Sequence, residues 1–262
     1  MGKVPFSNLT VKWQDCMNRW LLKTIVLSFC LMELTSVDAQ DSVQKQIWPE
    51  MDIYYRINDR FRLYSSISGT RSNSEYTDGT AGLYGDFFLR PWLNKRRDKT
   101  EMTDSSSGYY WWFRMGYSYS DAPPSDKRKV VNTLETETNN NFLLPAEFVL
   151  QTRNRLDWRW VNGDFQPIYR PRLKFIRNLR TEYLTFNLYA WSEYFFYLND
   201  NSQDRLRIAV GTVIKVLKVM DFETYFLHQF QNKQYVAPLN AIGIQLDFYF
   251  KNKNYQQHST DK

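Results

Sequence analysis

Polar and apolar side chains alternate with a period of two over long stretches of this 262-residue chain. Between residues 205 and 216, for example, Leu206, Ile208 and Val210 stand at even positions, whereas Arg205 and Arg207 stand at odd positions. Successive side chains of a β-strand point to opposite faces, so the pattern predicts strands with one apolar and one polar face. No helical period is sustained after the N-terminal segment. We therefore expect an all-β fold.

The alternation divides the chain into eleven candidate strands, joined by short turns or by longer polar connections. They are residues 46–57, 60–71, 79–90, 108–119, 128–138, 146–160, 164–176, 182–196, 203–216, 218–231 and 238–250. No linker or change of composition interrupts them, which predicts a single domain. Bacterial membrane barrels have an even number of strands. We therefore expect about twelve strands, with ten as the alternative, and place the missing one between Thr80 and Ser107.

An all-β domain of this kind is either a soluble sandwich or a transmembrane barrel. In a sandwich the apolar faces pack against each other, whereas in a membrane barrel they contact lipid. The candidate strands are about twice as long as the usual five or six residues of globular sheets, which suits a tilted crossing of a bilayer. Aromatic residues make up 17% of the chain and gather toward strand ends. These features favour an antiparallel up-and-down transmembrane barrel.

The stretch TRNRLDWRW, residues 152–160, indicates which face contacts lipid. Leu156, Trp158 and Trp160 share one face, and the opposite face carries Asp157 and three arginines. An arginine on the lipid face costs about 2–4 kcal/mol at the bilayer midplane. We therefore expect the aromatic face to contact lipid and the charged face to line the lumen.

The N-terminal segment has the features of a secretion signal. Arg19 and Lys23 precede a short apolar run, and Ala39 ends a small-residue cleavage site. The expected organisation is a leader over 1–39, with Met17 as an alternative start, a β-barrel domain over 40–250 and a polar tail over 251–262. An exported barrel of this kind is expected in the outer membrane of a Gram-negative bacterium.

The predicted leader also contains both cysteines, Cys16 and Cys30. A mature chain without it would have no disulfide and no cysteine-ligated metal. The net charge of +6 says little about partners, and we expect no cofactor and no nucleic acid for an exported chain. The expected partners are outer-membrane lipid and the barrel-assembly machinery, which would recognise the aromatic final strand ending at Phe250.

Several short charged motifs occur in the second half of the chain. They are Arg153–Arg159, Tyr169–Leu173, Ser192–Phe195, Asn199–Asp200 and Asp204–Arg205. Together they resemble a family of bacterial outer-membrane barrels catalogued as domain of unknown function 2490. Its members show an Arg-x-Arg-x-Glu-x-Arg strand, and this chain has Asp157 where Glu is usual; it also has Asp204–Arg205 where Asn–Arg is usual. The resemblance implies an outer-membrane barrel and no particular activity.

Strand parity places a dense set of charged side chains inside the barrel. The candidate site residues are Arg153, Arg155, Asp157, Arg159, Arg170, Arg172, Lys174, Glu193, Arg205, Arg207, Asp221 and Glu223. One interpretation is structural: buried charges pair across neighbouring strands and fill the lumen. The other is a pore, in which the basic surplus attracts small anionic solutes.

An enzyme that acts on lipid, such as a lipase or deacylase, is a further alternative. Such chemistry usually needs a histidine as general base, and the chain has two, His228 and His258. His228 shares its face with Phe226 and Phe230, which predicts that it points at lipid. Ser192 has the same orientation but lies two strands away. We therefore expect no enzymatic activity, and no metal, phosphate or nucleotide motif stands out.

Overall fold

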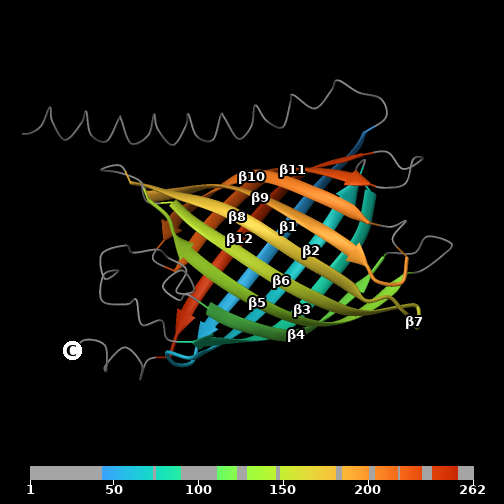
Figure 1. Cartoon of the computed structure of the whole chain (residues 1–262), viewed down its shortest axis with the longest axis horizontal. Helices are drawn as coiled ribbons and strands as arrows, with labels where there is room; N and C mark the ends of the chain where they lie inside the picture. The colour runs from blue at the N-terminus through green and yellow to red at the C-terminus, as the bar shows by residue number, and fades with distance from the viewer. Residues whose placement is uncertain are drawn as a thin grey trace, which may run out of the picture. The chain divides into compact units, whose positions relative to one another are not determined.

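The computed structural model describes residues 43–72, 75–89, 111–122, 129–145, 148–180, 185–200, 204–217, 219–231 and 238–252. Over these ranges the chain forms twelve β-strands and no helix, so no described helix is long and apolar enough to cross a membrane. The strands (Figure 1) are β1 Gln44–Arg56, β2 Phe61–Ser72, β3 Glu75–Leu89, β4 Trp111–Asp121, β5 Val130–Leu143, β6 Phe148–Val161, β7 Asp164–Phe165, β8 Ile168–Arg180, β9 Thr185–Tyr197, β10 Arg205–Leu217, β11 Met220–Gln231 and β12 Leu239–Lys251.

All twelve strands belong to one sheet, which closes on itself as a barrel. Each long strand pairs with its neighbours in chain order, β5 pairs with β6, and β12 pairs with β1. The two-residue β7 pairs only with the end of β6. Eleven long strands therefore form the wall, and each contains most of one of the eleven segments that alternation predicted. The predicted all-β barrel is confirmed.

The closing pair, β1 with β12, is parallel, whereas the other wall pairs are antiparallel. The expectation of an even number of wall strands was therefore wrong, and the parallel pair follows from the odd number. In an up-and-down wall with eleven strands, the first and last strands run the same way and can pair only in parallel. The segment 80–107, where a further strand was expected, contributes residues 80–89 to β3, and residues 90–107 lie outside the described ranges.

Each rim of the barrel is named here after the end of β1 that it contains. The Gln44 rim contains the start of β1, and the Arg56 rim contains its end. Because β12 runs parallel to β1, Lys251 lies at the Arg56 rim. The wall therefore begins at one rim and ends at the other. The predicted leader, 1–39, and most of the predicted tail, 253–262, lie outside the described residues.

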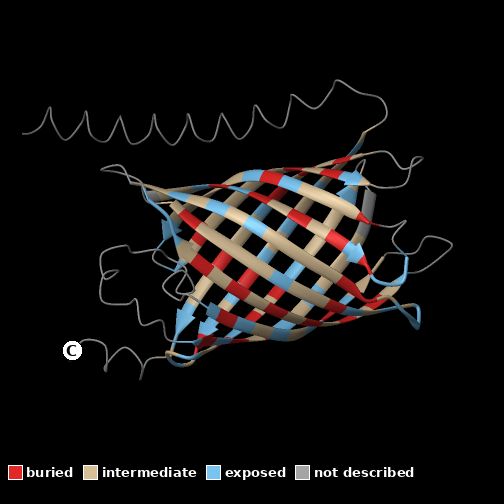
Figure 2. Cartoon of the chain, in the orientation of Figure 1, coloured by how far each residue is buried: buried red, intermediate tan, exposed pale blue. Residues whose placement is uncertain are grey.

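Burial alternates along the strands in the sense opposite to that of a soluble protein (Figure 2). Large apolar side chains point outward, among them Leu83, which is 63% exposed, and Val210, which is 52% exposed. Charged side chains such as Asp86 and Glu193 point inward and are fully buried. An apolar exterior around a polar interior is the arrangement of a transmembrane β-barrel. Trp158 and its outward neighbours lie on the apolar exterior, as predicted.

A ladder of four stacked tyrosines crosses the parallel seam inside the barrel. The ring of Tyr54 on β1 stacks on Tyr249 of β12 at a centroid distance of 4.9 Å, and on Tyr64 of β2 at 4.7 Å. Tyr64 in turn stacks on Tyr84 of β3 at 4.9 Å. The hydroxyls of Tyr54 and Tyr64 donate hydrogen bonds to the carboxylate of Asp52, at 3.1 Å. The tyrosine ladder therefore joins four neighbouring strands on both sides of the seam.

Two inward glycines provide the room that tyrosine rings on adjacent strands need. Tyr84 lies opposite Gly116, and Tyr225 lies opposite Gly243. A Cβ at Gly116 would stand 2.2 Å from the Tyr84 ring, and one at Gly243 would stand 2.0 Å from the Tyr225 ring. No larger residue fits beneath these rings, so the glycines allow aromatic side chains to lie flat against the inner wall.

Candidate functional site: the charged lumen

The inside of the barrel holds a cavity of about 830 Å³. Its lining includes Lys129 and Arg159, near the Gln44 rim, and Asn187 and Asp221, near the Arg56 rim. The cavity therefore extends along most of the wall. All twelve predicted site residues lie on the inward face of their strands, and all but Glu193 line this cavity.

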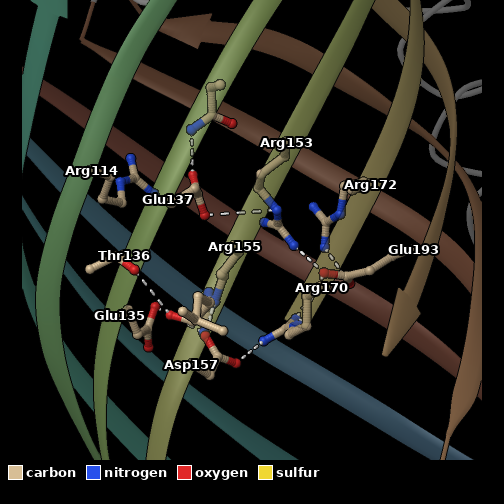
Figure 3. Close-up of polar contacts among 12 residues, drawn as sticks. Arg114, Glu135, Thr136, Glu137, Arg153, Arg155, Asp157, Arg170, Arg172 and Glu193 are labelled. Atoms are coloured by element: carbon tan, nitrogen blue, oxygen red, sulfur yellow. Dashed lines mark hydrogen bonds and ion pairs between the residues drawn. The ribbon is translucent and has the colours of Figure 1, made fainter. Parts of the chain in front are cut away.

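Glu193 on β9 is fully buried and is the acceptor for three arginines (Figure 3). Arg172, which lies opposite it on β8, donates to its Oε2 at 2.9 Å. Arg170, also on β8, lies 3.1 Å from Oε1, and Arg153 reaches the same oxygen from β6. One carboxylate therefore holds together side chains from three neighbouring strands, because charge-assisted hydrogen bonds to guanidinium are among the stronger polar contacts.

A second group of ion pairs links β5, β6 and β8. Asp157 accepts hydrogen bonds from Arg155 at 2.5 Å and from Arg170 at 3.0 Å. Arg155 also lies 2.9 Å from Glu135 on β5, and Glu137 lies 3.7 Å from Arg153. Since Arg153 and Arg170 also contact Glu193, the two groups form one continuous network, which Figure 3 shows across the inner wall.

Sequence reasoning missed Glu135 and Glu137 as site residues. Both lie on the inward face of β5 and are buried. The middle of the outward face of β5 carries Thr136 and Thr138, although Leu134 and Phe142 lie on the same face. When polar residues also occupy the outward face, alternation gives little indication of which side is inside. The signal that could have located them is the hairpin register, in which Glu135 faces Asp157 and Glu137 faces Arg155.

Three further cations of the predicted set contact aromatic rings inside the barrel. Arg205 donates to the hydroxyl of Tyr197 at 2.7 Å, and its guanidinium lies 4.5 Å from the centre of the Phe195 ring. Arg207 donates to the Gln229 side chain at 2.7 Å and lies over Phe195 and Trp48. The ammonium of Lys174 lies 3.9 Å from the Tyr189 ring. Rings favour cations at such positions without neutralising them, so these charges still act on the lumen.

The part of the wall next to β10, formed by β11, β12 and β1, is acidic. Asp221, Asp247 and Asp52 face one another in register across these three strands. Gln245 donates hydrogen bonds to both Asp52 and Asp247, at 3.0 and 2.8 Å. Glu50, also inward on β1, interacts electrostatically with its acidic neighbours and with Arg155 and Arg172.

The lumen carries charges of both signs, with a basic excess on β6, β8 and β10 and an acidic excess on β11, β12 and β1. The described residues that line the cavity include eleven basic and nine acidic side chains. Asp86 and Glu193 are buried behind arginines of the lining, and Arg56 is a further buried cation on the inward face of β1. We name two parts of the wall from this separation. The basic arc comprises Arg153, Arg155, Arg159, Arg170, Arg172, Lys174, Arg205 and Arg207, and the acidic arc comprises Glu50, Asp52, Asp221, Glu223 and Asp247.

His228 lies on the outward face of β11, as predicted, and its Nδ1 is 2.6 Å from Oδ1 of Asn240. Ser192 and His228 are both paired in register with Ile208. The intervening β10 therefore separates the serine from the histidine, as expected, and His258 lies outside the described residues. Among the residues that the structure describes, no group of three or more histidine, cysteine, aspartate or glutamate side chains is placed to hold a metal ion.

Comparison of the sequence with protein families gives a match. The family model described as "Protein of unknown function (DUF2490)" matches residues 45–236, which is most of the barrel. The chain belongs to the DUF2490 family. The resemblance drawn from the arginine motifs is thereby confirmed, and no curated protein matches this DUF2490 chain in sequence.

Two solved structures resemble the DUF2490 barrel. A bacterial polysaccharide outer membrane secretin has a TM-score of 0.44 and 11% identity, over 72% of this chain and 64% of that one. The β domain of the Bordetella autotransporter BrkA has a TM-score of 0.37 and 12% identity, over 71% of this chain and 78% of that one. The chain thus spans 64% of the secretin's length. At these scores neither similarity indicates what the DUF2490 chain does.

Proposed function

We propose that this protein is an outer-membrane barrel that forms a narrow pore for small anionic solutes. The observation that carries the proposal is the basic arc, whose eight cationic side chains come from β6, β8 and β10 and line a cavity that extends toward both rims. A row of cations along a low-dielectric wall lowers the energy of an anion beside it. The acidic arc would confine the anion to the basic side of the lumen.

Two sequence features support the compartment in this proposal. The first is the secretion signal predicted over residues 1–39. The second is β12, whose outward Phe248 and Phe250 end the wall with the aromatic pattern that the barrel-assembly machinery would recognise. The proposal assigns no enzymatic activity and no cofactor to the chain.

Membrane insertion predicts a depth-dependent effect of outward charge. Val210, which is outward near the middle of β10, should tolerate arginine poorly, because a cation there would lie in hydrocarbon. We expect Val210→Arg to lower the free energy of unfolding in phospholipid vesicles by about 2–4 kcal/mol. Leu217→Arg, at the last position of β10, is the matched control and should cost about 1 kcal/mol or less. Equal effects of the two variants would contradict a transmembrane wall.

The pore is tested by the conductance of the refolded barrel in planar bilayers under a salt gradient. We expect stable steps with a preference for anions. Arg159→Gln combined with Lys174→Gln should lower the anion-to-cation permeability ratio, by roughly tenfold at low ionic strength, because both cations line the cavity. Glu50→Gln, on the acidic arc, is the matched control and should raise the ratio. If neither variant changes the ratio, the arcs do not set the selectivity of the pore.

A closed barrel with a structural, salt-bridged lumen is the second candidate, and one cluster favours it. Asp86 is held between Arg62 and Arg114, both at 2.6 Å, and Phe88, beneath the Arg56 guanidinium, is fully buried. This cluster fills part of the interior toward the Arg56 rim. A correctly folded barrel that gives no conductance steps would favour the closed candidate over the pore.

A further inference from the structure

Polar side chains on the outer wall gather into a group at mid-height on β5 and β6, whereas elsewhere at this height in the described strands they occur singly or as one pair. On β5 and β6, outward threonines and asparagines form what we name the polar patch: Thr136, Thr138 and Asn140 from β5, with Thr152 and Asn154 from β6. The register brings them together, because Asn140 faces Thr152 and Thr138 faces Asn154. Asn154 is exposed and is the seventh of the fourteen residues of β6. The patch is therefore centred at mid-strand and not at a rim.

Other outward polar groups in the described strands do not form such a surface. Ser65 of β2 lies between outward Ile53 and Leu83. Ser192 of β9 lies opposite outward Ile208. Thr212 and Thr224 face each other across β10 and β11 as a single pair of hydroxyls. The outward amide of Asn132 lies near the start of β5 and accepts a hydrogen bond from Tyr117. Asn240, which contacts His228, is the second residue of β12. Among the described residues, side-chain amides at mid-strand on the outward face therefore occur only in the polar patch.

The polar patch is only partly satisfied by its own neighbours. Asn140 donates to Thr152 at 3.4 Å, Thr136 donates to the carbonyl of Leu156 at 3.5 Å, and Tyr169 donates to Oδ1 of Asn154 at 2.7 Å. Within the described ranges, these contacts leave the Nδ2 group of Asn154 and the hydroxyl of Thr138 without a hydrogen-bond partner. Hydrocarbon offers none, so unpaired donors at this depth raise the free energy of an isolated barrel.

We propose that the polar patch is the interface through which two copies of this chain associate in the membrane. The inference rests on the transmembrane part of the proposed function, but not on the lumen being a pore. A second copy fits the patch because amides and hydroxyls both donate and accept. The same surface turned through a two-fold axis therefore offers acceptors to its own donors. Lipid headgroups do not reach mid-height, so a protein surface is the partner that the position allows.

The residues around the patch suit such a contact. Trp111 and Phe113 of β4 lie opposite Asn140 and Thr138, and Leu173 of β8 lies opposite Thr152. All three apolar side chains are outward and more than a third exposed. An apolar border around a hydrogen-bonding centre would exclude lipid from the contact. The polar groups at the centre would then form hydrogen bonds with those of the second copy. Pro171, opposite Asn154, removes a backbone donor at this place without adding a bulky side chain.

The interface is tested by cysteine cross-linking in outer membranes. Cys16 and Cys30 are the only cysteines of the chain, so a background with serine at both positions carries one engineered thiol at a time. We expect Asn154→Cys to give a disulfide-linked species of twice the monomer mass under a lipid-soluble oxidant. Val210→Cys, at mid-strand on β10, is the matched control and should stay monomeric. Equal cross-linking of the two variants would overturn the proposal.

A second measurement avoids the engineered thiol. We expect the unmodified barrel to sediment as a dimer in mild detergent. The double variant Thr138→Val with Asn154→Leu should sediment as a monomer. As a control for folding, this variant should still migrate on a gel at a different apparent mass when it is not heated. A monomeric unmodified barrel that still floats with phospholipid vesicles would overturn the dimer alone. If the barrel fails to float with vesicles, the membrane location is overturned as well. Flotation therefore distinguishes a failure of the dimer proposal from a failure of the membrane location.

Discussion

Replacing Glu193 by glutamine is expected to lower the free energy of unfolding by about 3–5 kcal/mol, the cost of breaking a buried ion pair by removing one partner. The carboxylate is fully buried and accepts from Arg153, Arg170 and Arg172. Neutral glutamine keeps the shape but leaves three guanidinium groups with less opposing charge. Urea unfolding of the barrel in phospholipid vesicles, followed by tryptophan fluorescence, measures the change.

Glu50→Gln is the matched control for this prediction. Glu50 is also inward, but Glu223 and Asp247 are among the charges that act on it, so its carboxylate meets repulsion as well as attraction. We expect the control to change the free energy of unfolding little or to raise it. If both variants lower the free energy of unfolding equally, the loss comes from neutralising any buried carboxylate and not from the arginines around Glu193.

The second large effect is expected at the parallel seam. Tyr54→Ala removes a half-buried ring that stacks on Tyr249 and on Tyr64. Truncation of a fully buried aromatic residue typically costs about 3–5 kcal/mol, and we expect a loss toward the lower end of this range. Because Tyr249 belongs to β12 and Tyr64 to β2, the loss falls on the pair of strands that closes the wall. Urea unfolding measures the loss, and hydrogen exchange should show faster exchange of the β1 and β12 amides than of the β8 and β9 amides.

Tyr54→Phe separates stacking from hydrogen bonding in this prediction. Phenylalanine keeps both stacks, and Asp52 keeps its hydrogen bonds from Tyr64 and Gln245. We expect a cost of about 1 kcal/mol, the usual net value of one hydrogen bond. Tyr117→Ala, on the outward face of β4, should leave exchange at the seam unchanged. Equal exchange at the seam in Tyr54→Ala and the unmodified barrel would contradict the role of the tyrosine ladder.

The strands and the orientation of their faces could be predicted wherever one face was strongly apolar. On β10, Leu206, Ile208 and Val210 leave no doubt about the outward side, so the inward position of Arg205 and Arg207 followed directly. On β5 the middle of the outward face is polar, and the same reasoning failed to place Glu135 and Glu137. The outward threonines and asparagines of β5 prevented this assignment, and the same residues form part of the polar patch.

The partners of the charged residues could be predicted only in part. Arg172 and Glu193 lie opposite each other on neighbouring strands, so their contact follows from local register. Arg153 reaches Glu193 past the whole of β8, which depends on side-chain length and on the curvature of the wall. The number of wall strands could not be predicted from the alternation pattern, for a different reason. Alternation describes each strand by itself and contains no information on how the first strand meets the last.

The parallel seam also constrains how such a chain can be rearranged. In a barrel with an even number of strands the two ends of the wall meet at one rim, and a short linker could join them to allow new termini elsewhere. Here a linker from Lys251 to Gln44 would have to run back along β1, whose 13 residues extend over about 40 Å at the usual rise of a strand. Circular permutation of this barrel would therefore need a linker long enough to cross the full height of the wall. Growth by adding one hairpin would preserve its odd strand count, so the seam would persist through every such addition.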